Sequence, residues 1–412
     1  METTIRIQRT SIVANLFVIA LLIGFFIFNI VSKIFGLSDE GLSIEFRALI
    51  AVFSFYFIFN EILSNKIKSH LVRVYRLFLL FWLIYGIRII FDLFIDPINL
   101  YENKSAFYYI QFAFGVCLFP SLALIYVLRR YQLNYDFILK WTYGLLFIVL
   151  LISIYYRSAS GIVGRTIGEI NVGIISYGHY GTTLCLLSVY KILSQKKSFL
   201  LTATLVSGIL FGFFGIVISA SKSPLIALFI VSSVFIFFWH GRIKSFIILT
   251  LLGIILSLFL LDNLYFLSNY FESGFIERVL YTAEIESDEA RESLLKAASF
   301  DFSQNPIFGN AFLIQNHEFS GSYPHNSVVE AFMATGVSGG IIFIFLILKG
   351  FQKAINLIKS KSSFAWISLI FLQHLVLGMF SGNLYSSNLF WLTLVIIFSF
   401  DTSNISSLKI KA

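Results

Sequence analysis

The chain has 412 residues, of which 58% are hydrophobic and only 13% are charged, so it cannot cover a water-facing surface and we expect lipid to be its main solvent. The formal net charge of +8 comes from bases spread through short loops between hydrophobic runs, which argues against a nucleic-acid-binding surface. Both cysteines lie inside apolar runs, so neither a disulfide framework nor a zinc site is expected.

Twelve apolar runs follow one another along the chain. Most are about 18 to 24 residues long and continuously apolar, which predicts membrane-spanning helices and not the alternating strands of a β-barrel. The runs lie near residues 12–35, 46–63, 76–95, 108–128, 137–156, 171–193, 198–219, 224–240, 245–262, 327–348, 364–381 and 385–400. The sequence therefore predicts an all-α, polytopic integral membrane protein with about twelve transmembrane helices.

Lysine and arginine are distributed unevenly over the segments that connect these runs. With a cytoplasmic N-terminus, the inner segments hold 20 of the 30 basic residues and the outer segments hold eight. The positive-inside rule then predicts that both termini are cytoplasmic. We divide the chain into nine transmembrane helices (1–262), one large loop on the outer side with short helices (263–326), and three transmembrane helices with a cytoplasmic tail (327–412).

The large loop contains one segment with a clear helical pattern. Residues Ser287–Ala298 carry acids in the first turn of the expected helix, which should end before Pro306. Leu294, Leu295 and Ala298 form an apolar stripe, and Arg291 lies on the same face, which would turn its guanidinium toward the membrane domain. Arg291 either packs and pairs with a structural carboxylate or grips an anion, because a guanidinium forms bidentate bonds to phosphate oxygens.

The large loop ends at His325, where the next apolar run begins. Ser327 and Glu330 have the spacing of a capping box, which predicts the start of a helix here. His325 would then lie at the outer mouth of that helix, where the positive end of the helix dipole attracts phosphate and lowers the pKa of an imidazole. The simpler alternative is a histidine that only anchors the helix end by hydrogen bonding.

These motifs resemble those of a known family. His325-Asn326, followed at a fixed spacing by Gly336 and Gly339, is similar to the His-Asn signature of the O-antigen ligase and polymerase superfamily, the WaaL-like and Wzy-like membrane glycosyltransferases. The stretch Asn305–Gly309 resembles the Asn-Pro-hydrophobic-hydrophobic-Gly sequence that precedes the histidine in that family. Twelve helices with the main loop between the ninth and tenth also agree with the resemblance.

Basic residues extend the resemblance to other outer segments. Arg291 stands where the family has its loop arginine, and Gly164–Gly168 resembles an earlier outer loop that contains an arginine, here Arg165. At the outer junction Ser219–Ser223, Lys222 replaces the arginine that is common in the family. The charge is kept there, but the bidentate geometry of a guanidinium is not.

The resemblance implies transfer of a glycan from undecaprenyl pyrophosphate to a sugar hydroxyl on the outer face of the bacterial inner membrane, which would make the large loop 263–326 periplasmic. The leaving pyrophosphate is multiply charged, so Arg291, Arg165 and Lys222 are the cations expected to stabilise it. The attacking hydroxyl must lose a proton, and His325 is the expected base. His325 and Arg291 are therefore the predicted catalytic pair, and Arg165 and Lys222 are predicted to bind the pyrophosphate or substrate.

Other polar residues in or near membrane segments have two interpretations. Asn326, beside the expected base, is a further substrate-binding candidate. His179 either lines the cavity near Arg165, as a substrate-binding residue, or is a hydrogen-bonded packing histidine. Arg88 and Asp92 are four residues apart on one helix, which favours an internal ion pair over a place in a substrate channel.

We expect neither a metal nor another cofactor. The acidic residues Glu284, Glu286, Asp288 and Glu289 fit a solvated helix end better than a metal site. The expected partners are an undecaprenyl-pyrophosphate-linked glycan, membrane lipid, and a chain-length regulator and a flippase of the same pathway.

The expected function is polymerisation of undecaprenyl-pyrophosphate-linked oligosaccharide repeat units into O-antigen, capsule or exopolysaccharide. The alternative is an O-antigen ligase that transfers the glycan to lipid A core, which the short outer loop at 157–170 and the single large loop favour. The wider distribution of polymerase pathways places the polymerase first. A transporter or flippase for a lipid-linked sugar is the third interpretation, and it needs binding residues near the middle of the membrane, where charge is sparse here.

Overall fold

The computed structural model describes residues 9–34, 39–63, 73–101, 104–159, 174–194, 198–240, 283–315 and 318–400. Most of these residues are helical, as lipid requires of an apolar backbone whose N–H and C=O groups find no water. Serine side chains cap several helices at their N-termini: the hydroxyls of Ser11, Ser105 and Ser198 each accept a backbone N–H from the first turn. Beyond the helices, β1 (Arg9–Thr10) pairs in parallel with β2 (Tyr131–Gln132).

The helices before residue 160 include three π-helical segments, labelled η. In order they are α1 (Ile12–Ile19), η1 (Ala20–Gly24), α2 (Phe25–Ile34), α3 (Asp39–Leu63), α4 (Arg73–Ile90), η2 (Phe91–Ile95), α5 (Ala106–Ile110), η3 (Gln111–Leu118), α6 (Phe119–Arg130) and α7 (Tyr135–Ala159). The later helices are α8 (Ile174–Ser194), α9 (Phe199–Ser219), α10 (Lys222–His240), α13 (Ala283–Gln304), α14 (Ser327–Lys359), α15 (Ala365–Phe380) and α16 (Asn388–Ser399).

Eight helical segments among the described residues are long and apolar enough to cross a membrane. They are Ile12–Ser32, Ile44–Leu63, Arg73–Ile95, Ala106–Arg130, Tyr135–Tyr156, Phe199–Ser219, Lys222–Trp239 and Ser327–Lys359. The protein is therefore an all-helical integral membrane protein, as predicted. The total of twelve stays a prediction: α8, α15 and α16 coincide with further predicted runs, and the run at 245–262 lies outside the described residues.

An aromatic cluster joins the first half of the chain to the last helices. The ring of Trp391 on α16 lies 5.5 Å from that of Phe81 and 5.1 Å from that of Trp82, both on α4. Phe81 also stacks on Phe343 of α14, with 5.2 Å between ring centroids. These large buried rings fix α4, α14 and α16 against one another, so the outer ends of α4 and α14 have a defined position.

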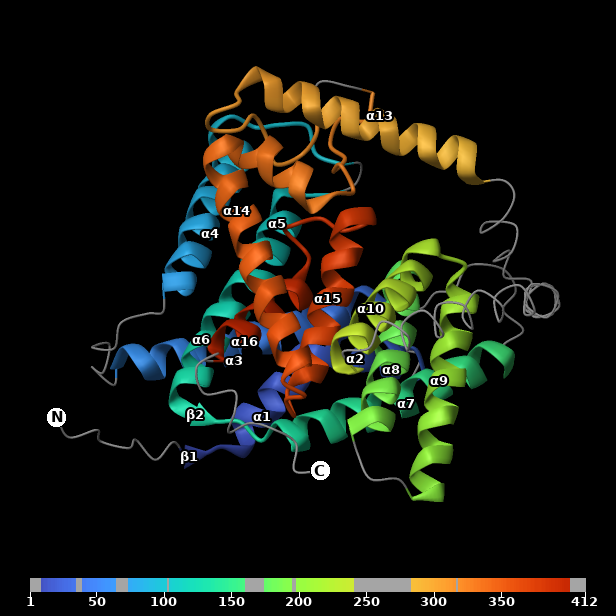
Figure 1. Ribbon diagram of the computed structural model, residues 1–412. Coiled ribbons are helices and arrows are strands. Elements are labelled where there is room, and N and C mark those ends of the chain that lie inside the picture. The colour runs from blue at the N-terminus through green and yellow to red at the C-terminus, as the bar shows by residue number, and fades with distance from the viewer. Residues whose placement is uncertain are drawn as a thin grey trace.

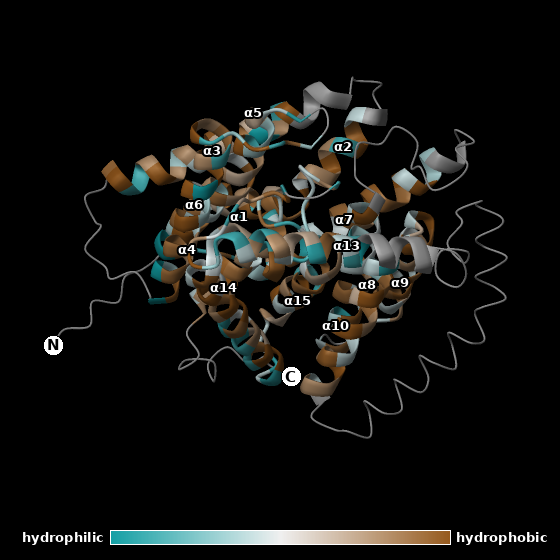
Figure 2. Ribbon diagram, turned by 90° about the horizontal axis from the view of Figure 1, so that it is seen from above, coloured by the Kyte–Doolittle hydropathy of each residue, from teal (hydrophilic) through white to brown (hydrophobic). Residues whose placement is uncertain are grey.

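The predicted loop helix is present as α13, longer than expected and ending before Pro306 as predicted. It lies across the ends of α4 and α14, at the top of Figure 1. Figure 2, seen from that side, shows hydrophilic and hydrophobic residues mixed along α13 and mostly hydrophobic residues along the helices around it. Two residues of the predicted apolar stripe, Leu294 and Ala298, are buried, whereas Leu295 is only partly buried and Arg291, expected on the same face, is exposed. The buried cluster here consists of Leu294, Ala297, Ala298, Ile314 and Met333.

Three segments of the described chain meet at this end of the bundle: residues 96–105 apart from 102–103, 283–326 apart from 316–317, and 381–387. We call this end the loop face. Gln315 connects the first two, because its side chain accepts the N–H of Asn99 at 2.8 Å and donates to the carbonyl of the same residue at 3.1 Å. The buried carboxylate of Asp301, near the end of α13, accepts the N–H of Gln315 at 2.7 Å. The described part of the large loop is thus held in place by hydrogen bonds of its own.

Candidate functional site

The Asn-Pro-Ile-Phe-Gly stretch packs directly on a kink in α14. Gly336 interrupts the helix with a φ of 64°, and the N–H of Val337 donates to the carbonyl of Pro306 at 2.8 Å. A Cβ on Gly336 would lie 2.2 Å from the carbonyl oxygen of Ile307. Gly309 has a φ of 82°, and a Cβ there would collide with the backbone of α14. The two motifs of the sequence are therefore one structural unit in which two glycines permit backbone contact.

Arg88 and Asp92 form the internal ion pair that their spacing predicts. The second carboxylate oxygen of the fully buried Asp92 accepts the N–H of Phe312 at 2.8 Å. The guanidinium of Arg88 donates to the carbonyl of Gly309 at 3.4 Å. The pair thus attaches the large loop to the end of α4 and to η2. Arg88 and Asp92 neutralise each other, and each also makes a hydrogen bond to the backbone of the loop.

The start of α14 differs from the predicted capping box. Asn326 is the N-cap, because its side-chain oxygen accepts the N–H groups of Val328 at 3.0 Å and Val329 at 3.1 Å. Its amide nitrogen donates to a carbonyl at the end of α15 at 3.3 Å. Ser327 is the first helical residue, and Glu330 does not reach back to it. The capping box was wrong because Glu330 has partners elsewhere in the fold.

Glu330 is fully buried on α14, and its carboxylate connects this helix to α4 and to the turn that follows α15. One carboxylate oxygen accepts the hydroxyl of Tyr85 on α4 at 2.7 Å, and the other accepts the N–H of Leu384 at 2.9 Å. Since Leu384 belongs to the turn between α15 and α16, Glu330 holds that turn against α14. The position of neighbouring Ser381 follows from this attachment.

His325 lies immediately before the N-cap, half-buried and with a left-handed φ of 53°. Its ring lies 4.3 Å from that of Tyr323, and it makes a hydrogen bond to the backbone of Ser381. Burial lowers the pKa of His325 below its ordinary value; the hydrogen bond to the Ser381 carbonyl opposes this, and the positive charge of Arg291 lowers the pKa further. With one ring nitrogen donating to Ser381, the other is the proton acceptor of the neutral imidazole.

Arg291 on α13 is exposed, and its positive charge acts on His325. The two residues that the sequence predicts as a catalytic pair therefore lie within electrostatic range of each other. Arg165, a predicted pyrophosphate ligand, lies outside the described residues.

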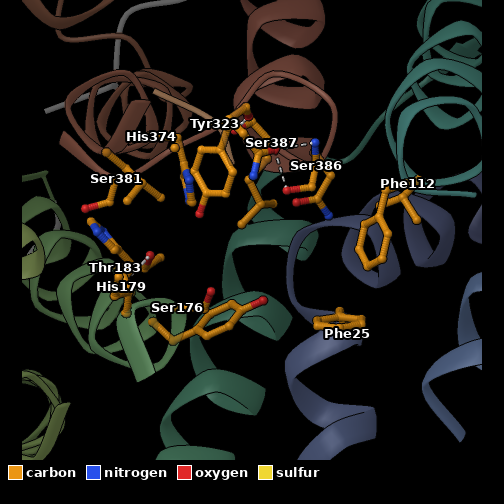
Figure 3. Close-up of a pocket in the computed structure, with 18 of the residues that line it drawn as sticks. Phe25, Phe112, Ser176, His179, Thr183, Tyr323, His374, Ser381, Ser386 and Ser387 are labelled. Carbon is orange, nitrogen blue, oxygen red and sulfur yellow. Dashed lines mark hydrogen bonds between the residues drawn. The ribbon is translucent and has the colours of Figure 1, made fainter. Parts of the chain in front are cut away.

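A cavity of about 510 Å³ lies beside His325, between α8 and the turn that follows α15 (Figure 3). Tyr323 and Ser381, the two residues in contact with His325, both line it. The other walls come from α2, α3, η3, α15 and the first turn of α16. A molecule in this cavity would therefore have the predicted base at its edge.

His179 lines this cavity and is also tightly packed, so both interpretations of it apply in part. Its Nε2 atom lies 3.0 Å from the hydroxyl of Ser223, and Gln373 donates to its backbone carbonyl at 2.7 Å. Ser223 follows Lys222, the first residue of α10. Lys222 is therefore adjacent in sequence to Ser223, which makes a hydrogen bond to His179.

The sequence analysis gave no role to Arg47, which lines the same cavity from α3. Its guanidinium carbon lies 4.8 Å from the ring centroid of Phe112, and one nitrogen donates to the side-chain oxygen of Gln111 at 3.3 Å. The sequence shows this arginine near the start of the apolar run 46–63, and a charge at that place could have marked it as a candidate site residue. What faces it could not be known from the sequence.

Comparison with known families matches residues 207–344 to a family model described as O-antigen ligase. The matched segment contains His325, Arg291, Lys222 and the stretch Asn305–Gly309, and it excludes Arg165. The resemblance inferred from the motifs is therefore confirmed by an independent comparison. The search of curated proteins found no match.

Proposed function

Because residues 207–344 match a family model described as O-antigen ligase, we propose that this protein is a membrane enzyme that polymerises undecaprenyl-pyrophosphate-linked repeat units at the periplasmic face of the inner membrane. The proposal rests on the hydrogen bonding and the protonation of the His325 ring. One nitrogen is fixed by the Ser381 carbonyl, and burial and Arg291 favour the neutral ring. An imidazole held in this way is prepared to accept a proton from a hydroxyl.

In the proposed reaction, an acceptor hydroxyl oxygen attacks the anomeric carbon of the lipid-linked glycan. The new glycosidic C–O bond forms as the bond to the pyrophosphate oxygen breaks, and His325 takes the hydroxyl proton. The pyrophosphate leaves with its electron pair, stabilised by Arg291, Lys222 and Arg165. We propose that these cations make a metal ion unnecessary. Inversion at the anomeric carbon is expected, because no side chain is proposed as a covalent nucleophile.

The second candidate function is ligation of a finished glycan to lipid A core. It is favoured by the description of the matching family as O-antigen ligase. The same residues would perform the same chemistry, with a different acceptor. The two functions therefore differ in their products and not in the roles given to His325 and Arg291.

A deletion strain complemented with variant proteins tests the proposal. A deletion that leaves one repeat unit on lipid A core indicates a polymerase, whereas polymer retained on undecaprenyl pyrophosphate with a bare core indicates a ligase. His325→Asn is the appropriate substitution, because asparagine tolerates the left-handed backbone that alanine does not. Arg291→Gln is matched by Lys296→Gln, an exposed cation on the same helix that pairs with Glu292 at 2.7 Å.

We expect His325→Asn and Arg291→Gln to reproduce the deletion pattern, and Lys296→Gln to give wild-type banding, all at equal membrane levels of protein. Wild-type banding from both site variants would refute the assigned base and anion ligand. The interpretation as a transporter of lipid-linked sugar would then have to be reconsidered.

A further inference from the structure

The cavity beside His325 has the chemical character of a sugar-binding site. Aromatic rings and short polar side chains alternate on its walls: Phe25, Phe112, Tyr180, Tyr323, Ser176 and Asn388. Aromatic faces pack against the C–H face of a pyranose ring, while hydroxyl and amide groups exchange hydrogen bonds with its hydroxyls. An isoprenoid chain alone would not need so many polar groups.

One lining residue adds a preference of charge. Arg47 lines the cavity, and among the described lining residues there is no Asp or Glu. Its guanidinium is held by the ring of Phe112 and the side chain of Gln111. A guanidinium held in this way can form two parallel hydrogen bonds to a carboxylate with little further loss of side-chain freedom.

The position of Arg47 separates it from the reacting pyrophosphate. The pyrophosphate is bonded directly to the anomeric carbon, so it must lie close to His325. His325 contacts the cavity through Tyr323 and Ser381. Figure 3 shows Phe112, the ring beneath the Arg47 guanidinium, on the opposite side of the cavity from Ser381. Arg47 is thus placed for an anionic group farther along a glycan.

Resting on the polymerase function, we propose that this cavity binds the end of the acceptor repeat unit, and that Arg47 selects a repeat containing an acidic sugar with a carboxylate. The acceptor hydroxyl would lie at His325 and the carboxylate at Arg47. The proposal thus assigns a substrate class, an acidic glycan, to a residue outside the catalytic pair.

The composition of the native polysaccharide is the first test. The proposal requires a carboxylate-bearing sugar in the repeat unit made by the strain of origin, and a repeat without one overturns it. With the carboxylate present, the repeat unit is released from its carrier by mild acid, which removes the pyrophosphate, and half of it is carboxyl-reduced. The dissociation constants of both forms are then measured on purified full-length protein in detergent.

The wild-type protein should bind the intact repeat at least about tenfold more tightly than the reduced one, because a hydrogen bond to a charged group typically changes the dissociation constant by this factor or more. Arg47→Gln should bind both forms equally weakly, and Arg47→Lys should retain part of the difference. Lys104→Gln removes another cation of the loop face, one that lies over Tyr108, and should behave like wild type. Equal binding of both forms by the wild-type protein would refute the proposal.

Geranylgeranyl pyrophosphate serves as the probe for the lipid carrier. If Arg47→Gln weakens binding of this probe and leaves binding of the released repeat unchanged, Arg47 serves the carrier and the inference is wrong. His325→Asn separates this failure from failure of the proposed function. It should abolish polymer formation while still binding the intact repeat more tightly than the carboxyl-reduced one, whereas normal polymer from His325→Asn would refute the function itself.

Discussion

The contact between Gly336 and the Asn-Pro stretch predicts a large effect from one added methyl group. In Gly336→Ala, the new Cβ would lie 2.2 Å from the carbonyl oxygen and 2.3 Å from the carbonyl carbon of Ile307. Backbone atoms cannot rotate away as a side chain does. The left-handed φ costs alanine about 1–2 kcal/mol, and overpacking adds about 1–3 kcal/mol. We therefore expect a loss of about 2–5 kcal/mol in the free energy of unfolding.

Thermal unfolding of purified protein in detergent, followed by tryptophan fluorescence, measures this loss as a lowered midpoint. Gly144→Ala on α7 is the matched control, because a Cβ there meets no atom within 4 Å. Gly336→Ala should also lose polymer formation, since the displaced stretch adjoins the helix that carries His325. Equal midpoints and equal polymer from the two variants would refute the close contact as the reason for glycine at this position.

Three further predictions concern charged groups. His325 is active when neutral, so the activity of the wild-type protein should fall as pH drops through its lowered pKa; Arg291→Gln removes a charge that lowers this pKa, so the titration of the His325 ring, followed by NMR, should move to higher pH. Glu330→Ala leaves the Tyr85 hydroxyl and a backbone N–H unsatisfied and should cost about 2–6 kcal/mol in thermal unfolding, whereas Glu330→Gln keeps an acceptor and should cost less than half as much. Asp92→Asn breaks a buried ion pair and should cost about 3–5 kcal/mol; wild-type stability would show that the pair does not hold the loop.

The helices were predictable because hydropathy alone determines where a chain can cross lipid. The apolar stripe of α13 and the ion pair of Arg88 with Asp92 were predictable for a related reason, since both follow from the spacing of residues along one helix. The motifs that carry the family resemblance also came from local sequence. The fold class, the loop helix and the resemblance are confirmed, while the number of spans and the membrane orientation stay predictions.

The start of α14 shows where local rules fail. Asn326 and Ser327 are both good N-cap residues, so the sequence allowed two starts one residue apart. The choice depends on Glu330, which would complete a capping box in an isolated helix. In the protein its partner is Tyr85, 245 residues away in the chain. A local pattern could not show that contact.

The cavity could not be predicted for the same reason. Arg47 and Tyr323 line it from opposite ends of the chain, and the turn 381–387 that completes it has no motif of its own. No spacing rule connects three such segments.

This turn also indicates what positions the proposed base. Ser381 accepts the hydrogen bond of His325, the side-chain amide of Asn383 donates one to the Tyr323 oxygen, and Leu384 is held by Glu330. The orientation of the imidazole is therefore determined by the turn between two apolar helices as much as by the loop that contains His325. A substitution that shifts the outer end of α15 should consequently impair proton transfer without any contact to substrate. The loop supplies the reacting groups, and the packing of the helices determines their geometry.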